Sequence, residues 1–262
     1  MRPETELVEI GVDGAVGSLR IARPAKLNAL SRQVLDELAE GARWFDTRED
    51  VKVVVISGQG GAFSAGFDLA EPVGAGPPDH GGGAASGRDM AESIGSMTAV
   101  TIASLRGHCI GGGVVLAAAC DMRVASESTV FRIPEIDLGI PLYWTGTPRL
   151  VRELGPSITK ELIMTGRAFD AREAAGWHFV NRVVRDDLLE EETSALAVQL
   201  AAKPRLALTV TKTQVDEASP QLPDSDGGVE SDAAGFAAAF DDPESREVAA
   251  RYIAEIAGRS RS

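Results

Sequence analysis

Two turns built from small residues are the parts of this sequence best suited to chemistry. The first lies within residues 61–69, GAFSAGFDL, after an apolar segment at 51–57. The second is the triple glycine at 111–113, into which a predicted strand at 100–105 leads. Such turns bare backbone N–H groups, and the first N–H groups of a helix lie unpaired at the positive end of its dipole. They can bind a phosphate or the oxygen of a polarised carbonyl. Close packing of a helix on a strand explains either turn alone, whereas two neighbouring turns can direct two donors at one oxygen.

A glutamate between two prolines is the best candidate for proton transfer. Glu135 follows Pro134, precedes Pro141 and lies beside Phe131 and Ile136 in the sequence. Stiff and apolar surroundings predict a held, partly desolvated carboxylate, whose pKa would suit an acid/base. An ordinary surface glutamate is the alternative, since most glutamates in proteins are exposed.

Other catalytic constellations are not indicated. Ser64 lies in Ala-Phe-Ser-Ala-Gly and not in the G-x-S-x-G turn of serine hydrolases. The three histidines show no metal-ligand spacing, so we expect no metal site. The glycine turns lack the lysine of a phosphate-binding P-loop. The two cysteines, Cys109 and Cys120, are expected to be small buried residues and not a redox pair.

Composition and charge restrict the partners. The chain has 262 residues, 44% of them hydrophobic and 25% charged, as in ordinary globular proteins. A formal net charge of -13 argues against nucleic acid and anionic membranes as partners. No apolar run approaches the ~20 residues of a membrane span, and the acidic N-terminus differs from a signal peptide. We therefore expect a cytoplasmic protein. The charge does not exclude an anionic small ligand, which needs only a few local basic groups and backbone N–H donors.

Strand and helix patterns alternate along the first part of the chain. The predicted strands lie at residues 7–10, 15–21, 51–57, 100–105, 121–125, 129–131 and 180–184, the first two joined at Asp13-Gly14. The predicted helices lie at residues 31–45 (with Ser31 as N-cap), from about 88, and at 114–120, 148–165, 170–175, 187–202, 206–216, 233–240 and 243–256. This order predicts an α/β fold with a core at 1–200 and a C-terminal helical region at 201–262.

Two segments are predicted to be loops. Residues 71–87, EPVGAGPPDHGGGAASG, are rich in glycine, proline and alanine. They predict a lid over an active site or, as the alternative, a solvated surface loop. Residues 134–141, PEIDLGIP, form a second loop that is stiffened by a proline at each end.

Four separated stretches resemble the crotonase superfamily, the enoyl-CoA hydratase/isomerase family. They are RPAKLNAL at 23–30, GAFSAGFDL at 61–69, GHCIGGGVVLAAACDMRVAS at 107–126 and FRIPEIDLGIP at 131–141, and residues 150–184 also match. The resemblance implies a crotonase-like spiral core of repeated ββα units. It also implies C-terminal helices that assemble a homotrimer, commonly doubled to a hexamer. The implied substrate is an acyl-CoA thioester, with coenzyme A as part of the substrate and no separate cofactor.

The resemblance also implies roles for individual residues. The thioester oxygen would accept hydrogen bonds from the backbone N–H groups of Ala65 and Gly112, and Glu135 would be the acid/base. The residues that would contact the substrate are Ala25, Lys26, Leu27, Gly66, Phe67, Asp68, Leu69, Gly111, Val115, Pro134 and Tyr143.

One departure from the family pattern concerns the chemistry. Family hydratases carry a second glutamate on the helix after the glycines, and Val115 occupies that position here. A single base suffices to move a proton between two carbons, so double-bond isomerisation is expected beside hydration. Decarboxylation, carbon–carbon bond formation and an impaired acyl-CoA-binding protein are the alternatives. Tyr143 and Asp137 are candidates for the missing polar group, and a wall or loop role is the alternative for each.

Two further departures concern the ends of the substrate. Residues 141–146 include Tyr143 and Trp144, where hydratases have small residues. These rings would shorten the acyl pocket, stack on an aromatic acyl group, or pack at a subunit interface. After Tyr252 the chain lacks the lysine that in the family reaches a CoA phosphate, which predicts weaker binding at that end.

Overall fold

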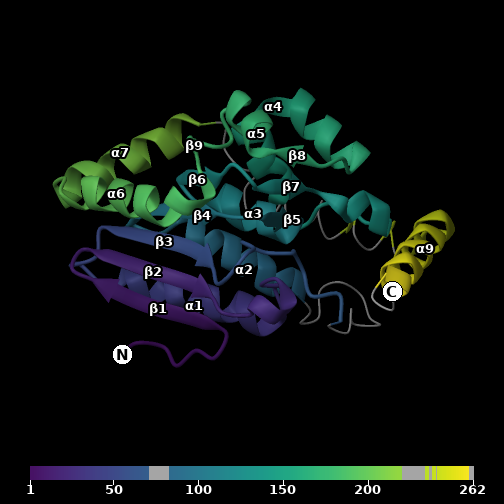
Figure 1. The fold of residues 1–262 in the computed structure, drawn as a ribbon, viewed down its shortest axis with the longest axis horizontal. Helices are drawn as coiled ribbons and strands as arrows, with labels where there is room; N and C mark the ends of the chain where they lie inside the picture. Colours follow the sequence, from purple (N-terminus) through teal and green to yellow (C-terminus); the bar gives the residue numbers. More distant parts are fainter. Residues whose placement is uncertain (71–82, 220–233, 236–237, 240, 260–262) are drawn as a thin grey trace.

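A six-stranded sheet, in the order β1-β2-β3-β4-β6-β9, runs through the middle of the protein (Figure 1). The computed structural model describes residues 1–70, 83–219, 234–235, 238–239 and 241–259. The strands of this sheet are β1 (Val8–Asp13), β2 (Val16–Ile21), β3 (Val53–Gly58), β4 (Val100–Leu105), β6 (Met122–Ser126) and β9 (Arg182–Val184). β1 and β2 form the predicted antiparallel hairpin, and all other neighbours are parallel. Parallel strands are buried on both faces, which requires apolar runs such as the one in β3.

A second sheet contains the three short strands β5 (His108–Ile110), β7 (Val130–Arg132) and β8 (Phe169–Asp170). It corrects the prediction that the strand at 100–105 leads directly into the triple-glycine turn. β4 ends at Leu105, and β5, in the other sheet, precedes the glycines. Gly107, with a φ of 56°, turns the chain from one sheet to the other, in a conformation that residues with a side chain rarely adopt.

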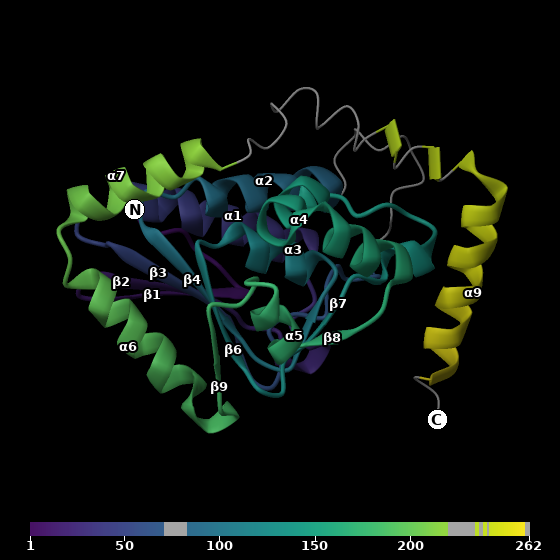
Figure 2. The same ribbon diagram turned by 90° about the horizontal axis from the view of Figure 1, so that it is seen from above.

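Helices cover both faces of the large sheet (Figure 2). On one face lie α1 (Arg32–Asp46), α2 (Gly83–Gly95) and α3 (Gly112–Ala119), and α6 (Leu189–Ala201) lies on the other. Ser31 is the N-cap of α1, as predicted, and its hydroxyl accepts a bond from the N–H of Val34 at 3.4 Å. The prediction of a loop over residues 71–87 is wrong for residues 83–87, because α2 begins at Gly83. Residues 71–82, the rest of that loop, lie outside the described residues.

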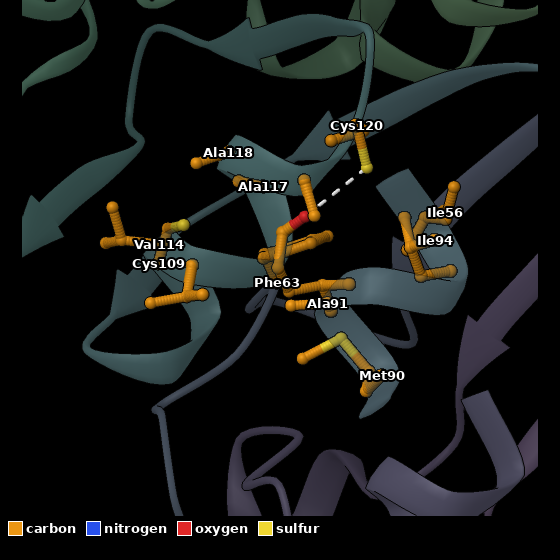
Figure 3. Close-up of a cluster of buried hydrophobic side chains, with 14 of the residues drawn as sticks. Ile56, Phe63, Met90, Ala91, Ile94, Cys109, Val114, Ala117, Ala118 and Cys120 are labelled. Carbon is orange, nitrogen blue, oxygen red and sulfur yellow. Dashed lines mark hydrogen bonds between the residues drawn. The ribbon is translucent and has the colours of Figure 1, made fainter. Parts of the chain in front are cut away.

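The helix α3 is apolar on every side, and all of its 8 residues are buried. Figure 3 shows residues of α3 among Phe63, Met90 and Ile94. Phe63 comes from the small-residue turn at 61–69, and Met90 and Ile94 come from α2. At its end the thiol of Cys120 donates to the carbonyl of Leu116 at 3.4 Å. A close-packed interior holds such a helix in one position, so its N-terminal N–H groups have fixed directions.

The remaining elements lie towards the C-terminus. They are η2 (Pro134–Leu138), α4 (Gly146–Thr165), α5 (Ala171–Gly176), η3 (Asp186–Leu188), α7 (Arg205–Ala218) and α9 (Pro243–Arg259). One further short helix, η1 (Pro24–Lys26), lies near the N-terminus. The 3₁₀ helix η2 corrects the prediction of a loop at 134–141. Of the predicted helix at 233–240, residues 234–235 and 238–239 are described and helical, and the other four lie outside the described residues. Of the helices that the structure describes, none is long and apolar enough to cross a membrane.

Candidate active site

The triple-glycine turn joins β5 to α3 in a backbone conformation that only glycine adopts readily. Gly111 has a φ of 51° and a ψ of -117°. Gly112 is the first residue of α3, and its N–H has no hydrogen-bond acceptor among the described residues. This N–H group is therefore available to a ligand, at the positive end of the helix dipole.

The small-residue turn lies directly alongside the glycines. The N–H of Ser64 donates to the carbonyl of His108 at 2.9 Å, and the N–H of Ile110 donates to the carbonyl of Ser64 at 3.0 Å. Gly66 comes so close that a Cβ atom there would lie 2.8 Å from the carbonyl oxygen of Ile110 and 3.7 Å from the nitrogen of Gly112. The two turns, distant in sequence, thus adjoin in space.

The second predicted donor already has an acceptor within the chain. The N–H of Ala65 donates to the carbonyl oxygen of Leu27 at 2.9 Å. Leu27 and Asn28 both have left-handed backbones, with φ angles of 48° and 55°. The side-chain amide of Asn28 holds this loop through bonds to the carbonyls of Gln59 and Ala62. A ligand oxygen at Ala65 would therefore share or replace the carbonyl of Leu27, and the assignment of Ala65 stays a prediction.

The carboxylate of Glu135 lies against the same turn. A Cβ atom on Gly111 would lie 2.5 Å from Oε1 of Glu135. Oε2 is buried and has no hydrogen-bond partner among the described residues. Burial raises the pKa of Glu135 from 4.5 to about 7, since a charged carboxylate loses its hydration there. Near neutral pH both protonation states are populated, which suits a group that takes and returns a proton.

The small sheet explains why this glutamate meets the glycines. β5 and β7 are parallel neighbours, so the chain leaves both strands at the same edge of the sheet. Gly111 follows β5 at that edge, and its N–H donates to the carbonyl of Arg132, the last residue of β7, at 2.8 Å. Pro134, buried, then starts η2 and carries the next residue, Glu135, towards the turn.

The position of the missing second glutamate is apolar. Val115 is fully buried in α3, and a Cβ atom on Gly146 would lie 2.7 Å from its Cγ2. The carboxylate of Asp137 accepts a bond from the guanidinium of Arg132 at 2.6 Å, which engages it in an ion pair. Tyr143 is buried in the segment that leads into α4. Its suggested role as a second polar group stays a prediction.

Most of the predicted coenzyme A contacts are exposed, whereas Asp68 is buried. Ala25 and Lys26 lie in η1 and are exposed, as are Leu27 and Leu69. Phe67 is half-buried after Gly66. The exposed residues lie at the protein surface, which is compatible with their predicted role.

An arginine that sequence analysis did not single out organises this surface. Arg23 and Lys26 donate to the same oxygen of Asp68, at 2.9 Å and 3.3 Å. Burial acts to raise the pKa of Asp68, but hydrogen bonds from Arg23, Ala70 and Lys26 outweigh it and lower the pKa. The Arg-Pro pair directly before the predicted contact residues was the available signal for Arg23.

Metal and thiol chemistry find no support in the described part of the chain. It contains no group of three or more histidine, cysteine, aspartate or glutamate side chains that could hold a metal ion. Cys109 and Cys120 are buried free thiols. Burial raises the pKa of Cys109 well above its usual value and that of Cys120 to about 12. Both stay protonated at neutral pH and are poor nucleophiles.

Known proteins share this architecture. An enoyl-CoA hydratase/isomerase from Pseudoalteromonas atlantica has the same fold, with a TM-score of 0.86 at 24% identity over 95% of this chain and 98% of that one. A Thermobifida fusca protein described as an enoyl-CoA hydratase, in complex with acetoacetyl-CoA, is 31% identical with a TM-score of 0.74. That match covers 88% of this chain and 93% of the other.

Sequence relatives agree with the structural match. A "probable enoyl-CoA hydratase" of Mycobacterium bovis is 36% identical over 221 residues, which is 83% of each chain. The carnitinyl-CoA dehydratase of Citrobacter koseri is 34% identical over 215 residues, which is 82% of this chain and 81% of that one. The family model for enoyl-CoA hydratase/isomerase matches residues 11–255. The chain is an enzyme that belongs to the enoyl-CoA hydratase/isomerase family.

Proposed function

We propose that this enzyme forms a thioester enolate at the two turns and uses Glu135 as its single acid/base. The observation that carries the proposal is the position of the Glu135 carboxylate against Gly111, one residue before the available N–H of Gly112. A donor that is already oriented stabilises the negative oxygen without reorganising. The Glu135 carboxyl, with a pKa of about 7, can then exchange a proton with the carbon next to the thioester.

Double-bond isomerisation is the reaction that one carboxylate completes alone. Glu135 takes a proton from the carbon next to the thioester of a 3-enoyl-CoA, which gives an enolate conjugated with the double bond. The protonated Glu135 then returns the proton to the far carbon of that system, which gives the 2-enoyl-CoA. Hydration also requires a group that orients water, and Val115 offers none. Hydration by Glu135 alone is therefore the second candidate reaction. It is supported by the relatives described as a hydratase and a dehydratase.

The substrate is proposed to be an acyl-CoA thioester that enters over η1. The relatives from Thermobifida fusca were solved with acetoacetyl-CoA and with CoA. In this chain the exposed Lys26 provides a cation beside the turn, although it already pairs with Asp68. The thioester oxygen is proposed to bind Gly112 and to share or replace the Leu27 carbonyl at Ala65.

Assembly and location rest on the family resemblance. We propose a homotrimer or a hexamer, with residues 1–200 as the acyl-CoA-binding core and 201–262 as the region that packs between subunits. A cytoplasmic location stays a prediction.

Turnover assays on crotonyl-CoA and a 3-enoyl-CoA test the chemistry. We expect Glu135→Gln to lower the rate by about 10²–10⁴-fold, because the amide cannot exchange the proton. Glu190→Gln is the matched control, since the side chain of Glu190 is 85% exposed in α6. Binding of acyl-CoA without any Glu135-dependent turnover, on a panel that also includes malonyl-type thioesters, would instead identify an acyl-CoA-binding protein.

A backbone test addresses the donor. Gly112→Pro removes the N–H, and proline is accepted at the first position of a helix. Gly112→Ala is the control, because both changes add a Cβ atom against Trp144 while only proline removes the donor. We expect the proline variant to be slower than the alanine variant by about 10²–10³-fold. Equal rates in the two variants would refute the role of Gly112.

A further inference from the structure

We infer that the indole of Trp144 closes the acyl pocket beside the reacting carbons and restricts this enzyme to short acyl groups. The inference rests on the proposed function, because it places the thioester at Gly112 and Glu135. It assigns to the side chain of Trp144 the selection of substrates by the length of their acyl group. This role is separate from the proton transfer.

Two glycines from different helices enclose the indole ring. Gly87 lies in α2 and Gly112 starts α3, and a Cβ atom on either one would overlap the ring of Trp144. The ring is therefore in van der Waals contact with the backbone of both helices. Trp144 is 6% exposed within its own chain. Contacts within its own chain, and not the cover of a second subunit, bury it.

The ring lies next to the atoms that would do the chemistry. Its contact residue Gly112 supplies the available N–H, and Glu135 lies against the preceding residue, Gly111. The ring of Phe67, from the other turn, makes a T-shaped contact with the indole, with ring centroids 6.1 Å apart and an interplanar angle of 78°. Trp144 thus spans both turns. In the proposed binding mode, an acyl chain that continues beyond the reacting carbons meets this aromatic wall, so the wall favours a small acyl group.

The backbone holds the ring in this place. Trp144 and Thr145 are consecutive residues in the left-handed region, with φ angles of 63° and 55°. Such conformations are unfavourable for residues with a side chain and persist where the surroundings enforce them, often at ligand sites. The N–H of Gly146 donates to the carbonyl of Tyr143 at 3.0 Å, and Nε of the buried Arg149 donates to the Thr145 hydroxyl at 3.3 Å. The indole is accordingly a fixed wall.

The binding of unreactive saturated thioesters tests the inference independently of catalysis. Butyryl-CoA and decanoyl-CoA would be titrated into the wild type, Trp144→Ala, Trp144→Leu and Trp44→Phe by calorimetry. We expect the wild type to prefer butyryl-CoA. We expect Trp144→Ala to improve the affinity for decanoyl-CoA, relative to butyryl-CoA, by at least about 10-fold, since methylene groups gain a hydrophobic site. Trp44, on α1, is a matched tryptophan outside the site, and its replacement should leave the preference unchanged.

Turnover separates the failure of this inference from that of the proposed function. A short and a long 3-enoyl-CoA, 3-hexenoyl-CoA and 3-decenoyl-CoA, would be compared by kcat/KM in the same variants, together with crotonyl-CoA and 2-decenoyl-CoA. The shift towards the long substrate should match the binding shift. A wild type that binds both saturated thioesters equally would overturn the inference. Thermal unfolding would identify which of Trp144→Ala and Trp144→Leu is folded, by its cooperative transition. An unchanged preference for butyryl-CoA over decanoyl-CoA in a folded variant would also overturn the inference. Absence of Glu135-dependent turnover with an intact binding shift would refute the proposed chemistry and leave the role of Trp144 standing.

Discussion

The Glu135 carboxyl is buried, and this burial has a cost that can be measured without an assay of catalysis. Its Oε2 is buried with no partner in the described part of the chain, and its pKa rises from 4.5 to about 7. A carboxyl whose pKa is higher in the folded state is favoured by folding in its neutral form. Its contribution to stability is complete below about pH 4.5 and is lost as the pH rises through about 7.

Replacing Glu135 by glutamine should therefore stabilise the protein at high pH only. We expect Glu135→Gln to raise the unfolding free energy at pH 8 by up to about 3 kcal/mol and to have little effect at pH 4.5. Denaturant unfolding at both pH values measures this difference. The same titration predicts a wild-type turnover that rises with pH through about 7 if the ionised base limits the rate. A variant that is less stable than the wild type at pH 8 would contradict the cost of burying the ionised Glu135 carboxylate.

At the scale of elements, the C-terminal helix supports the element that carries Glu135. α9 packs on η2 (Figure 2), and Gly139, the C-cap of η2, approaches the backbone of Ser245 in α9. A Cβ atom on Gly139 would overlap the carbonyl oxygen of Ser245. Gly139 also has a φ of 69°, which disfavours any side chain. The position of α9 is thereby coupled to the position of the proposed acid/base.

Gly139→Ala tests this coupling against Gly14→Ala. Gly14 has a φ of 55° with no atom near an added Cβ, so its alanine variant carries the conformational cost alone, about 1 kcal/mol. We expect Gly139→Ala to lose more stability than Gly14→Ala and, unlike it, to lower the turnover number. Thermal unfolding and steady-state kinetics measure the two effects. Equal behaviour of the two variants would show that α9 does not position η2.

At the scale of the whole molecule, α7 presents apolar side chains outward. Leu206 and Val210, four residues apart on one face, are 75% and 43% exposed. The helix is attached to the sheet by Lys212, which pairs with Asp121 at 2.8 Å, and by Arg205, which donates to the carbonyl of Val51 at 2.6 Å. This face lies in the region proposed to pack between subunits.

Charging that face should weaken the assembly. We expect the double variant Leu206→Asp, Val210→Asp to shift a trimer or hexamer towards the monomer, because the new carboxylates would need to be buried without partners. Light scattering after size-exclusion chromatography measures the mass. Val12→Asp, at a 41% exposed position on β1, is the control for a surface charge elsewhere. A mass that is unchanged by the double variant would place the interface on another face.

Local sequence was sufficient for most of the elements. The hairpin at Gly14, the N-cap at Ser31 and the fully apolar α3 follow from turn chemistry and periodicity, which act between near neighbours. The resemblance of the motifs, confirmed by the match to the family over residues 11–255, established the enzyme class. The roles of Ala65, Gly112 and Glu135 stay predictions, although their residues were found within one small region of the fold.

The sequence by itself thus determined the fold class, the family and the candidate carboxylate. Only the tertiary structure decided that β5 enters a second sheet, that the carbonyl of Leu27 accepts a hydrogen bond from the N–H of Ala65, and that Trp144 lies between Gly87 and Gly112. Each of these depends on contacts between segments far apart along the chain. Periodicity and capping act over a few residues and carry no information about such contacts, whereas close packing of the folded chain selects them.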